Sequence, residues 1–433
     1  MGDWAGLYLS LFLLMLVRYG ADWQRNWGIH LRPFSILFPI WILTLYGAYL
    51  YETRFFRFSI DTLRAIGTAI FIALVASITA FYIFPPGLIY PRRNMVIFAA
   101  IYGVVLTLWR LGFYKIVGQR IKTNVLFLGS SPEVNELTEY FREHPHLGYT
   151  NAGVLDAASN GLNHINGTVA EKSVGLIVVS GDKNRGLTKN LFPLLSAGTT
   201  VIELEEFYER TLSKVSLEIF SDLWFIKNLE NINAEVYKIV KRTSDILFGA
   251  IGLIFLAILY LPIAIAIKLN SPGPIIFKQK RTGKNNKVFY MYKFRTMRAL
   301  NPDGSAETEG PQWAADKDSR ITGTGKLLRK TRLDELPQVW NILNGDMSFV
   351  GPRPERPEFV EKLAEQIPYY SMRHLVRPGL TGWAQINYEY GNSVEDARIK
   401  LQYDIYYAKK RSIMLDLTII LKTFKTVLTR QGQ

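Results

Sequence analysis

The sequence predicts a chain of three parts: a membrane α-helical bundle, an α/β module of Rossmann-like type, and a mainly α domain with a re-entrant membrane helix. Three observations support this prediction. Four apolar runs fill residues 1–118, strand and helix patterns alternate over 119–232, and a further apolar run containing Pro262 opens the segment 238–433. With 433 residues, the chain is long enough for three such domains.

The composition restricts the class of partner. The chain is 48% hydrophobic, and 51 Lys and Arg against 37 Asp and Glu give a formal net charge of +14. A basic balance suits nucleic acid, an anionic membrane surface or a polyphosphate substrate. Because long apolar runs accompany the charge, the last two are favoured and no nucleic-acid partner is expected. The absence of cysteine excludes disulfides, thiol catalysis and thiolate metal sites.

The first part of the chain is predicted to be a bundle of about four helices. The last three apolar runs approach the roughly twenty residues that cross a bilayer, whereas the first is short, so a truncated or interfacial helix remains an alternative there. Basic residues flank every run, so the charges do not orient the bundle. The runs are about Trp4 to Val17, Phe34 to Tyr51, Ile66 to Phe84 and Met95 to Phe113.

The second part has the alternation of a doubly wound α/β sheet. Buried strands are expected at 124–129, 175–180 and 200–204, with helices between them. Gly129 is followed by Ser130, Ser131 and Pro132, without the further glycines that let a pyrophosphate approach the backbone. A structural or regulatory role is therefore favoured over a dinucleotide site. The enzyme alternative, an NAD-dependent nucleotide-sugar epimerase or dehydratase, would need such a site near Gly129.

The run 246–267 is predicted to enter the membrane and return on the same side. Pro262 removes a helical hydrogen bond, which leaves about sixteen residues before it, or about 24 Å of helix against a hydrocarbon core of about 30 Å. Both flanks are basic, which is typical of the cytoplasmic side. We therefore expect a re-entrant helix at 245–269 with a structural break at Pro262. A spanning helix with a tolerated kink is the alternative.

Beyond this helix, cations and aromatic residues alternate without any acidic residue between Lys278 and Arg298. Such a mixture can bind lipid headgroups, a nucleotide diphosphate or single-stranded nucleic acid, and the adjacent membrane helix favours the first two. The polar segment 298–320 is expected to be a loop over a site. The cations are Lys278, Lys280, Arg281, Lys284, Lys287, Lys293, Arg295 and Arg298.

Two adjacent carboxylates, Asp334 and Glu335, precede a helical pattern that Gly345 is expected to end. Near a helix N-terminus, backbone N–H groups favour ionised carboxylates and also phosphates. Carboxylates among cations indicate phosphoryl chemistry with a carboxylate nucleophile or a metal ion. The simpler alternative is a helix cap and a first-turn charge. Downstream, Arg353 between Pro352 and Pro354 is a second candidate for holding a phosphate.

The C-terminal segment is expected to contain a turn-rich loop that packs Trp383 and then two helices, at 393–407 and 413–429. An apolar face of the second helix includes Leu417 and Leu421. This face fits either the protein core or a membrane surface.

From about Lys241 to the C-terminus, the chain resembles the bacterial sugar transferases, the monotopic phosphoglycosyl transferases that act on polyprenyl phosphates. The preceding bundle and α/β module resemble the long form of that family. The segments Gly351 to Pro357 and Tyr403 to Tyr407 resemble the exosortase-associated exopolysaccharide branch. Besides Pro262, the matching motifs are Ser271-Pro-Gly-Pro274, Lys293-Phe-Arg-Thr-Met297, Arg332-Leu-Asp-Glu-Leu-Pro-Gln338, Gly345-Asp-Met-Ser348, Gly351-Pro-Arg-Pro354 and Arg377-Pro-Gly-Leu-Thr-Gly-Trp383.

The resemblance implies transfer of a hexose-1-phosphate from a UDP-sugar to undecaprenyl phosphate with release of UMP. It implies that Asp334 is the nucleophile, forming an aspartyl-phosphosugar, and that Glu335 and Asp334 hold Mg2+. It further implies a bacterial inner-membrane protein whose catalytic domain faces the cytoplasm, with a homodimer as one compatible assembly. A membrane scaffold or flippase component that only holds lipid is the non-enzymatic alternative. The expected phosphate-binding residues are Arg353, Arg332, Lys293, Arg295 and Arg281.

Overall fold

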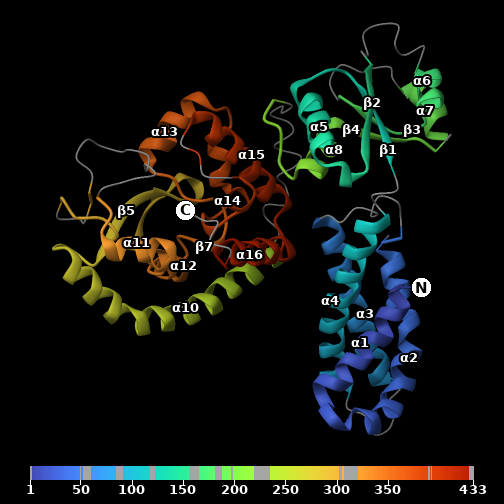
Figure 1. The fold of residues 1–433 in the computed structure, drawn as a ribbon, viewed down its shortest axis with the longest axis horizontal. Coiled ribbons are helices and arrows are strands. Elements are labelled where there is room, and N and C mark those ends of the chain that lie inside the picture. Colours follow the sequence, from blue (N-terminus) through green and yellow to red (C-terminus); the bar gives the residue numbers. More distant parts are fainter. Residues whose placement is uncertain are drawn as a thin grey trace. The chain divides into compact units, whose positions relative to one another are not determined.

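The computed structural model describes residues 2–48, 50–51, 60–83, 91–117, 122–155, 165–180, 188–196, 198–218, 235–301, 305–306, 320–388, 391 and 393–428. Contacts divide the chain into two compact units, Met1–Arg210 and Thr211–Gln433 (Figure 1). Most of the predicted polar loop at 298–320 lies outside the described residues.

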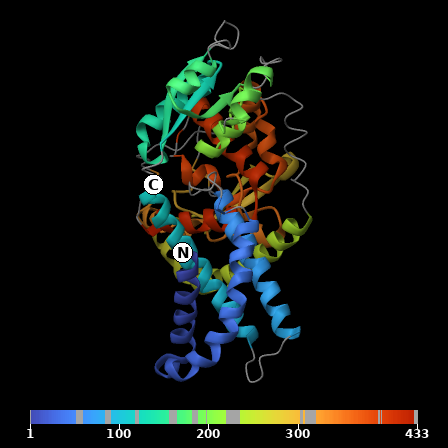
Figure 2. The same cartoon turned by 90° about the vertical axis from the view of Figure 1, so that its right-hand side faces the viewer.

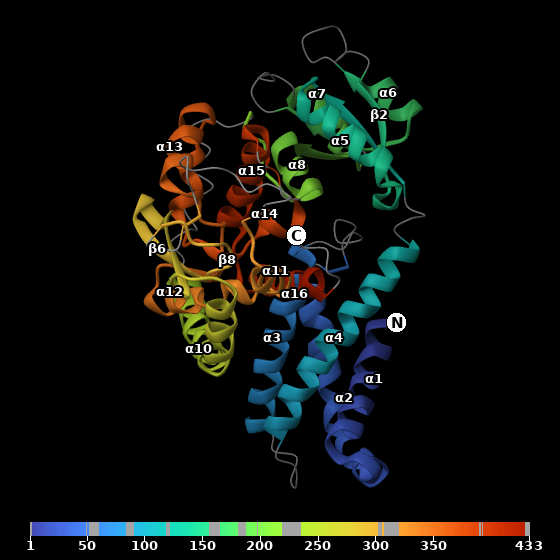
Figure 3. The ribbon, with the colours of Figure 1, turned by 60° about the vertical axis from the view of Figure 1, so that its left-hand side comes forward.

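The N-terminal helices form a bundle in which sequence neighbours pack against each other, and the first helix also packs against the last. They can be followed side by side in Figure 3. Among the described residues, this confirms the predicted set of apolar N-terminal helices. The helices are α1 (Gly2–Tyr19), α2 (Trp23–Gly47), α3 (Ile60–Ile83) and α4 (Pro91–Val117), with a short 3-10 turn, η1 (Gly20–Asp22), between the first two.

Aromatic side chains fill the centre of the bundle. Phe34, Phe38 and Phe98 are fully buried, and Phe98 stacks on Phe38 with 5.9 Å between ring centroids. The indole of buried Trp41 donates a hydrogen bond to a serine hydroxyl across the bundle at 3.0 Å. The outer faces remain apolar and exposed. By length and composition, candidate membrane spans among the described residues are 2–47, 62–83 and 93–113 in this bundle, and 235–270 in the second unit.

The rest of the first unit contains a parallel sheet, which can be followed in teal and green in Figure 2. Within the described residues its strand order is β2-β1-β3-β4. The three expected strands are confirmed as β1 (Thr123–Leu128), β3 (Val174–Val179) and β4 (Thr200–Glu203), and β2 (Tyr149–Leu155) is an additional strand that the sequence analysis missed.

Helices cover both faces of this sheet. The ring of Phe127 contacts Phe141 of α5 (Pro132–Glu143) and Phe207 of α8 (Leu204–Leu212) on one face. The neighbouring Leu126 and Leu128 point to the opposite face, where they pack with residues of α6 (Ile165–Glu171) and α7 (Thr188–Ser196). The period-2 alternation of the strand explains this division.

In the residues that the structure describes, the second unit is mostly helical and contains two small two-stranded sheets (Figure 1). The cation-rich segment after the apolar helix is an antiparallel hairpin of β5 (Ile276–Thr282) and β6 (Val288–Phe294), joined by η7 (Lys284–Asn286). The remaining elements are α10 (Glu235–Asn270), α11 (Gly323–Lys330), η8 (Leu333–Glu335), α12 (Gln338–Asn344), β7 (Ser348–Val350), α13 (Pro357–Gln366), η9 (Tyr370–Leu375), β8 (Gly379–Thr381), α14 (Trp383–Asn387), α15 (Val394–Lys410) and α16 (Ile413–Leu428).

Helix α10 is one continuous helix of 36 residues, with Pro262 inside it. Pro262 therefore does not interrupt the helix. In Figure 1 the helix is an arc whose convex side is turned away from the rest of the unit. The helix also carries many large apolar residues that are exposed, such as Leu247 at 60% and Leu261 at 66%.

The concave side of α10 packs against α12 at two glycines. A Cβ added to Gly249 would lie 2.8 Å from Leu343, and one added to Gly252 would lie 2.9 Å from Val339. Both distances are shorter than ordinary contacts. Arg242 adds hydrogen bonds of 2.7 Å to two carbonyls at the C-terminal end of α12. These contacts fix α12, and hence the residues just before it, on the apolar helix.

The segment 213–218 packs onto the C-terminal helices of the second unit. The carbonyl of Ser213 accepts a hydrogen bond from the indole of Trp383 at 2.8 Å, and the amide of Val215 donates to the carbonyl of Gln402 at 3.3 Å. Trp383 is 3% exposed and stacks on Tyr406. The indole is therefore packed inside the second unit, which agrees with a structural role for this segment.

In α16, the two faces differ. Leu415 and Ile419 are fully buried, whereas Leu417 and Leu421 are 47% and 61% exposed. The predicted apolar face of this helix is therefore not part of the core of the second unit at these two residues.

Candidate functional site

The two adjacent carboxylates lie in η8, a single 3-10 turn that leads directly into α12. Arg332, just before the turn, has a left-handed backbone with φ 56°. Gly345 ends α12 with φ 90°, which confirms the expected helix stop. Asp334 and Glu335 are each only 8% exposed. Charged groups that are this buried normally have partners, and the two residues differ in whether they have one.

Glu335 is held by two cations. Its Oε1 accepts a hydrogen bond from Lys293 Nζ at 2.9 Å and another from Arg353 Nη2 at 2.8 Å. Burial favours the neutral acid, but the two cations outweigh it, so the pKa of Glu335 lies well below its ordinary value. The side chain is therefore ionised at neutral pH.

Asp334 has no such partner. Its buried Oδ1 has no hydrogen-bond donor among the described residues. Burial raises the pKa of the Asp334 carboxyl above its ordinary value, while the charge of Lys293 is the strongest opposing influence. A carboxyl oxygen that is buried and unpaired is suited to accept a cation or, once ionised, to attack an electrophile.

Lys293 comes from β6, so the hairpin contributes the central cation of the site. Burial lowers the pKa of Lys293, and the carboxylate of Glu335 opposes this effect. Arg353 comes from the loop that follows β7. The chain therefore brings together residues 293, 334, 335 and 353 from three separate segments.

Two guanidinium groups hold the backbone around Arg353 through hydrogen bonds to carbonyl groups. Its carbonyl accepts a hydrogen bond from Arg373 at 3.0 Å, and the carbonyl of Pro354 accepts one from Arg281 at 2.9 Å. Gly351 allows this close packing, because a Cβ there would clash with the carbonyl of Arg377. The prolines and these two guanidinium groups hold the loop in one conformation.

The other three predicted phosphate-binding residues, Arg295, Arg281 and Arg332, have different surroundings from those of Lys293 and Arg353. Arg295 is 2% exposed and its guanidinium donates to the carbonyls of Ser271 and Pro272, the latter through a very short contact. Arg281 also pairs with Gln279 and Glu355, which places it behind the loop of Arg353. Arg332 is exposed beside the acidic pair. Phosphate binding by these three stays a prediction.

A further network, which the sequence patterns did not indicate, lies behind Arg353. Arg373 donates to the hydroxyl of Tyr370 at 2.6 Å and pairs with Asp404 at 2.8 Å, and both charged side chains are almost completely buried. Asp404 lies within the segment 403–407, whose pattern of Tyr and Asp was the available signal. Only the fold shows that this carboxylate balances a buried arginine.

The residues at the acidic pair fit a divalent cation. Mg2+ is usually held by one or two carboxylates together with waters and substrate phosphates. The orphaned Oδ1 of Asp334, next to ionised Glu335, supplies such a donor set. Among the described residues there is no cluster of three acidic or histidine side chains, so a substrate phosphate would have to complete the coordination.

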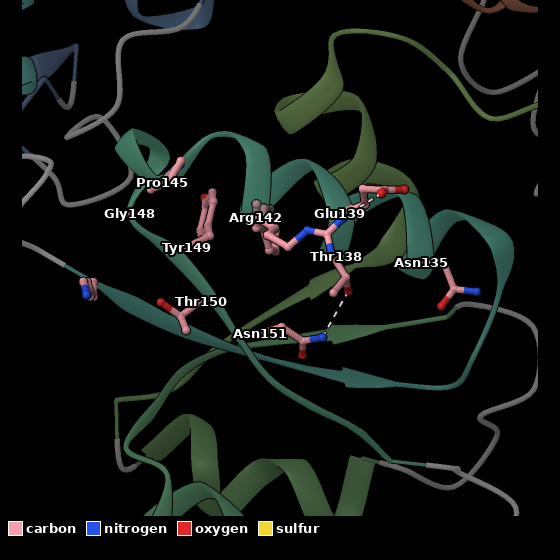
Figure 4. Close-up of a pocket in the computed structure, with 11 residues that line it drawn as sticks. Asn135, Thr138, Glu139, Arg142, Pro145, Gly148, Tyr149, Thr150 and Asn151 are labelled. Atoms are coloured by element: carbon pink, nitrogen blue, oxygen red, sulfur yellow. Dashed lines mark hydrogen bonds and ion pairs between the residues drawn. The ribbon is translucent and has the colours of Figure 1, made fainter.

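A separate cavity of about 500 Å3 lies on the parallel-sheet module of the first unit, between α5 and β2. Figure 4 shows its polar rim, where Asn151 donates to Thr138 at 3.1 Å and Arg142 pairs with Glu139 at 2.9 Å. Gly129 does not line this cavity. The cavity therefore gives no support to a dinucleotide site at that glycine.

Residues 236–430 match the family model described as bacterial sugar transferase. A UDP-glucose:undecaprenyl-phosphate glucose-1-phosphate transferase of Klebsiella pneumoniae is 32% identical, over 72% of this chain and 69% of its own length. A UDP-N-acetylgalactosamine-undecaprenyl-phosphate N-acetylgalactosaminephosphotransferase of Aeromonas hydrophila is 47% identical, over 46% of this chain and 45% of its own. The exopolysaccharide production protein PSS of Rhizobium leguminosarum bv. phaseoli is 41% identical, over 44% of this chain and 96% of its own.

The match thus spans less than half of the Aeromonas relative and about two thirds of the Klebsiella one. The family model covers every residue of the acidic pair and of the cations that hold it. The chain belongs to the bacterial sugar transferase family.

Proposed function

We propose that this protein transfers a hexose-1-phosphate from a UDP-sugar to undecaprenyl phosphate and releases UMP. The observation that carries the proposal is the unpaired, buried Oδ1 of Asp334 beside a carboxylate that two cations keep ionised. The names of the relatives support the substrate classes. The sugar itself is left open, because those relatives use different UDP-sugars.

In the first step, Asp334 Oδ1 attacks the phosphorus that bears the sugar. The bond from this phosphorus to the bridging oxygen breaks, and UMP leaves with that oxygen. In the second step, a phosphate oxygen of undecaprenyl phosphate attacks the aspartyl-phosphosugar, which frees Asp334 and forms the lipid diphosphate sugar. Both attacks bring together negatively charged groups.

The cations of the site reduce this repulsion. Lys293 and Arg353 lie within hydrogen-bond distance of Glu335 and can also reach oxygens of a bound diphosphate. Mg2+, held by Asp334 and Glu335, would neutralise further charge on the diphosphate. The guanidinium of Arg295 would have to give up hydrogen bonds to two carbonyls to bind a phosphate, so the proposal relies on Lys293 and Arg353 instead.

The proposed placement follows from α10. Its exposed apolar face would enter the cytoplasmic leaflet of the bacterial inner membrane and return, which would leave Asp334 at the surface where a lipid phosphate arrives. The arc of α10 supports this placement. The match to an exopolysaccharide production protein supports a role in exopolysaccharide assembly. We further propose a degenerate Rossmann-like module over 119–232, a catalytic domain over 238–433 and, as one option, a homodimer.

The test measures UMP release by the purified protein in detergent, with undecaprenyl phosphate, Mg2+ and a panel of UDP-sugars. We expect Asp334→Asn to abolish release and chelation of Mg2+ to suppress it in the wild type. Intact-protein mass spectrometry without lipid acceptor should detect the sugar-phosphate adduct on the wild type but not on the variant. Full activity of Asp334→Asn would reject the covalent role.

A further inference from the structure

A second group of cations lies near the other end of α10 from the acidic pair. It consists of Lys238 of α10, Lys284 of η7, Arg377 after η9 and Arg411 between α15 and α16. The segment around η8 packs instead with Ile263 and Ile267, about 40 Å from Lys238 along the helix. This group, the distal basic cluster, therefore does not belong to the site of Asp334.

The fold brings the members of the distal basic cluster together. His374 Nδ1 and Asn286 Oδ1 lie 2.6 Å apart, which ties the loop of Lys284 to the segment that ends at Arg377. The guanidinium of Arg411 lies over the ring of Tyr237, 5.2 Å from its centroid and next to Lys238. Partial desolvation lowers the pKa of Lys284, and the charges of the other three cations lower it further.

Three of these cations lack a counter-charge. Within the described part of the chain, Lys284, Arg377 and Arg411 make no ion pair, and the Nε and Nη2 of Arg411 are buried without an acceptor. Lys238 pairs with Glu235 at 2.8 Å. Buried donors are normally satisfied, and like charges held together repel each other. A bound anion with several oxygens resolves both problems, as arginines and lysines commonly do with phosphate.

The surroundings indicate where that phosphate comes from. Val236 and Ile239 of α10 are 76% and 63% exposed, and Ile413 at the start of α16 is 55% exposed. Apolar side chains beside unpaired cations are typical of a surface that meets both acyl chains and headgroups. A phosphate that carries acyl chains satisfies both features, whereas free phosphate satisfies only the charge.

We propose that Lys238, Lys284, Arg377 and Arg411 form a binding site for the phosphate headgroup of an anionic phospholipid. The site would anchor the N-terminal end of α10 at the membrane surface. This proposal does not depend on the proposed transferase reaction, because no residue of the cluster takes part in it.

The experiment titrates phosphatidylglycerol into the purified full-length protein in detergent and counts bound lipids by native mass spectrometry. We expect Arg411→Gln and Lys284→Gln to weaken phosphatidylglycerol binding about tenfold each. Lys362→Gln removes one exposed charge from α13 and should leave binding unchanged. Arg411→Lys, which keeps the charge, should recover part of the affinity. Lys284 is exposed, so its variant keeps the test valid if Arg411→Gln does not fold.

Two further arms identify the source of the phosphate. Inorganic phosphate should displace the lipid no better than sodium chloride of equal ionic strength, and phosphatidylcholine should bind more weakly than phosphatidylglycerol. Equal lipid binding by wild type, Arg411→Gln and Lys284→Gln would overturn the site. Displacement by inorganic phosphate would support a phosphate site and overturn the lipid as its occupant. Separate measurement of UMP release tells whether the transferase reaction fails independently.

Discussion

Replacing Lys293 by glutamine removes the cation that acts on both acidic side chains of the site. Its ammonium lies 2.9 Å from Glu335 and is the strongest charge that lowers the pKa of Asp334. Arg353 remains to hold Glu335 ionised, whereas the cations that still act on Asp334, Arg329 and Arg332, lower its pKa less than Lys293 does. We therefore expect the main effect on Asp334.

The size of the effect follows from the usual influence of one nearby opposite charge on a carboxyl group. An opposite charge within about 4–6 Å shifts the pKa of a carboxyl by about 1–3 units. Lys293 lowers the pKa of Asp334, so its loss raises that pKa. Attack requires the ionised carboxylate, so activity is lost as pH falls through this pKa, and the acid limb of the profile should move to higher pH by about 1–3 units.

The assay is the pH profile of kcat/KM for UMP release, which reports the groups of the free enzyme. Lys362→Gln, with the same loss of charge on the exposed surface of α13, serves as the matched control and should keep the wild-type profile. Lys293→Arg keeps the charge, so its acid limb should lie between the limbs of the wild type and of Lys293→Gln. If the acid limb of Lys293→Gln coincides with that of the wild type, the electrostatic assignment of Lys293 is refuted.

Two further predictions concern the frame around the site. Asp404→Asn leaves Arg373 buried without its counter-charge, so we expect a loss of about 3–5 kcal/mol in the free energy of unfolding, measured by urea denaturation. The double replacement Asp404→Leu with Arg373→Met should lose less, and an equal or larger loss would contradict this account. Gly252→Leu should destabilise the contact of α10 with α12 by about 1–3 kcal/mol, because a Cβ at this position would lie 2.9 Å from Val339. The unfolding temperature lost in Gly252→Leu should be partly recovered when Val339→Ala is added. If it is not recovered, the strain does not arise from the contact with Val339.

Much of the local structure was predictable because it depends on neighbouring residues. Apolar runs with a length near twenty residues predicted the helices of the bundle, and strand patterns predicted β1, β3 and β4. Gly345 predicted the end of α12, since a left-handed residue there is easiest for glycine. The strand β2 was missed, and so was the hairpin of β5 and β6, whose alternating cations and aromatic residues were assigned only a binding role.

The roles of individual cations were not predictable in the same way. Lys293 and Arg295 stand two residues apart in one motif, and both were predicted to bind phosphate. In the structure Lys293 meets Glu335, whereas Arg295 donates to the carbonyls of Ser271 and Pro272. Period and composition cannot separate them, because the difference arises from which distant segment each side chain meets.

The sequence by itself determined the apolar helices, the adjacent carboxylates and the excess of cations, because hydrophobic periodicity, charge and chain stiffness are local properties. Only the tertiary structure decided that Glu335 is paired while Asp334 keeps an unpaired oxygen. It also decided that, within the described part of the chain, the Nε and Nη2 of Arg411 find no hydrogen-bond acceptor at the far end of α10. Burial and ion pairing depend on contacts between residues far apart in the chain, and these contacts exist only once the chain has folded.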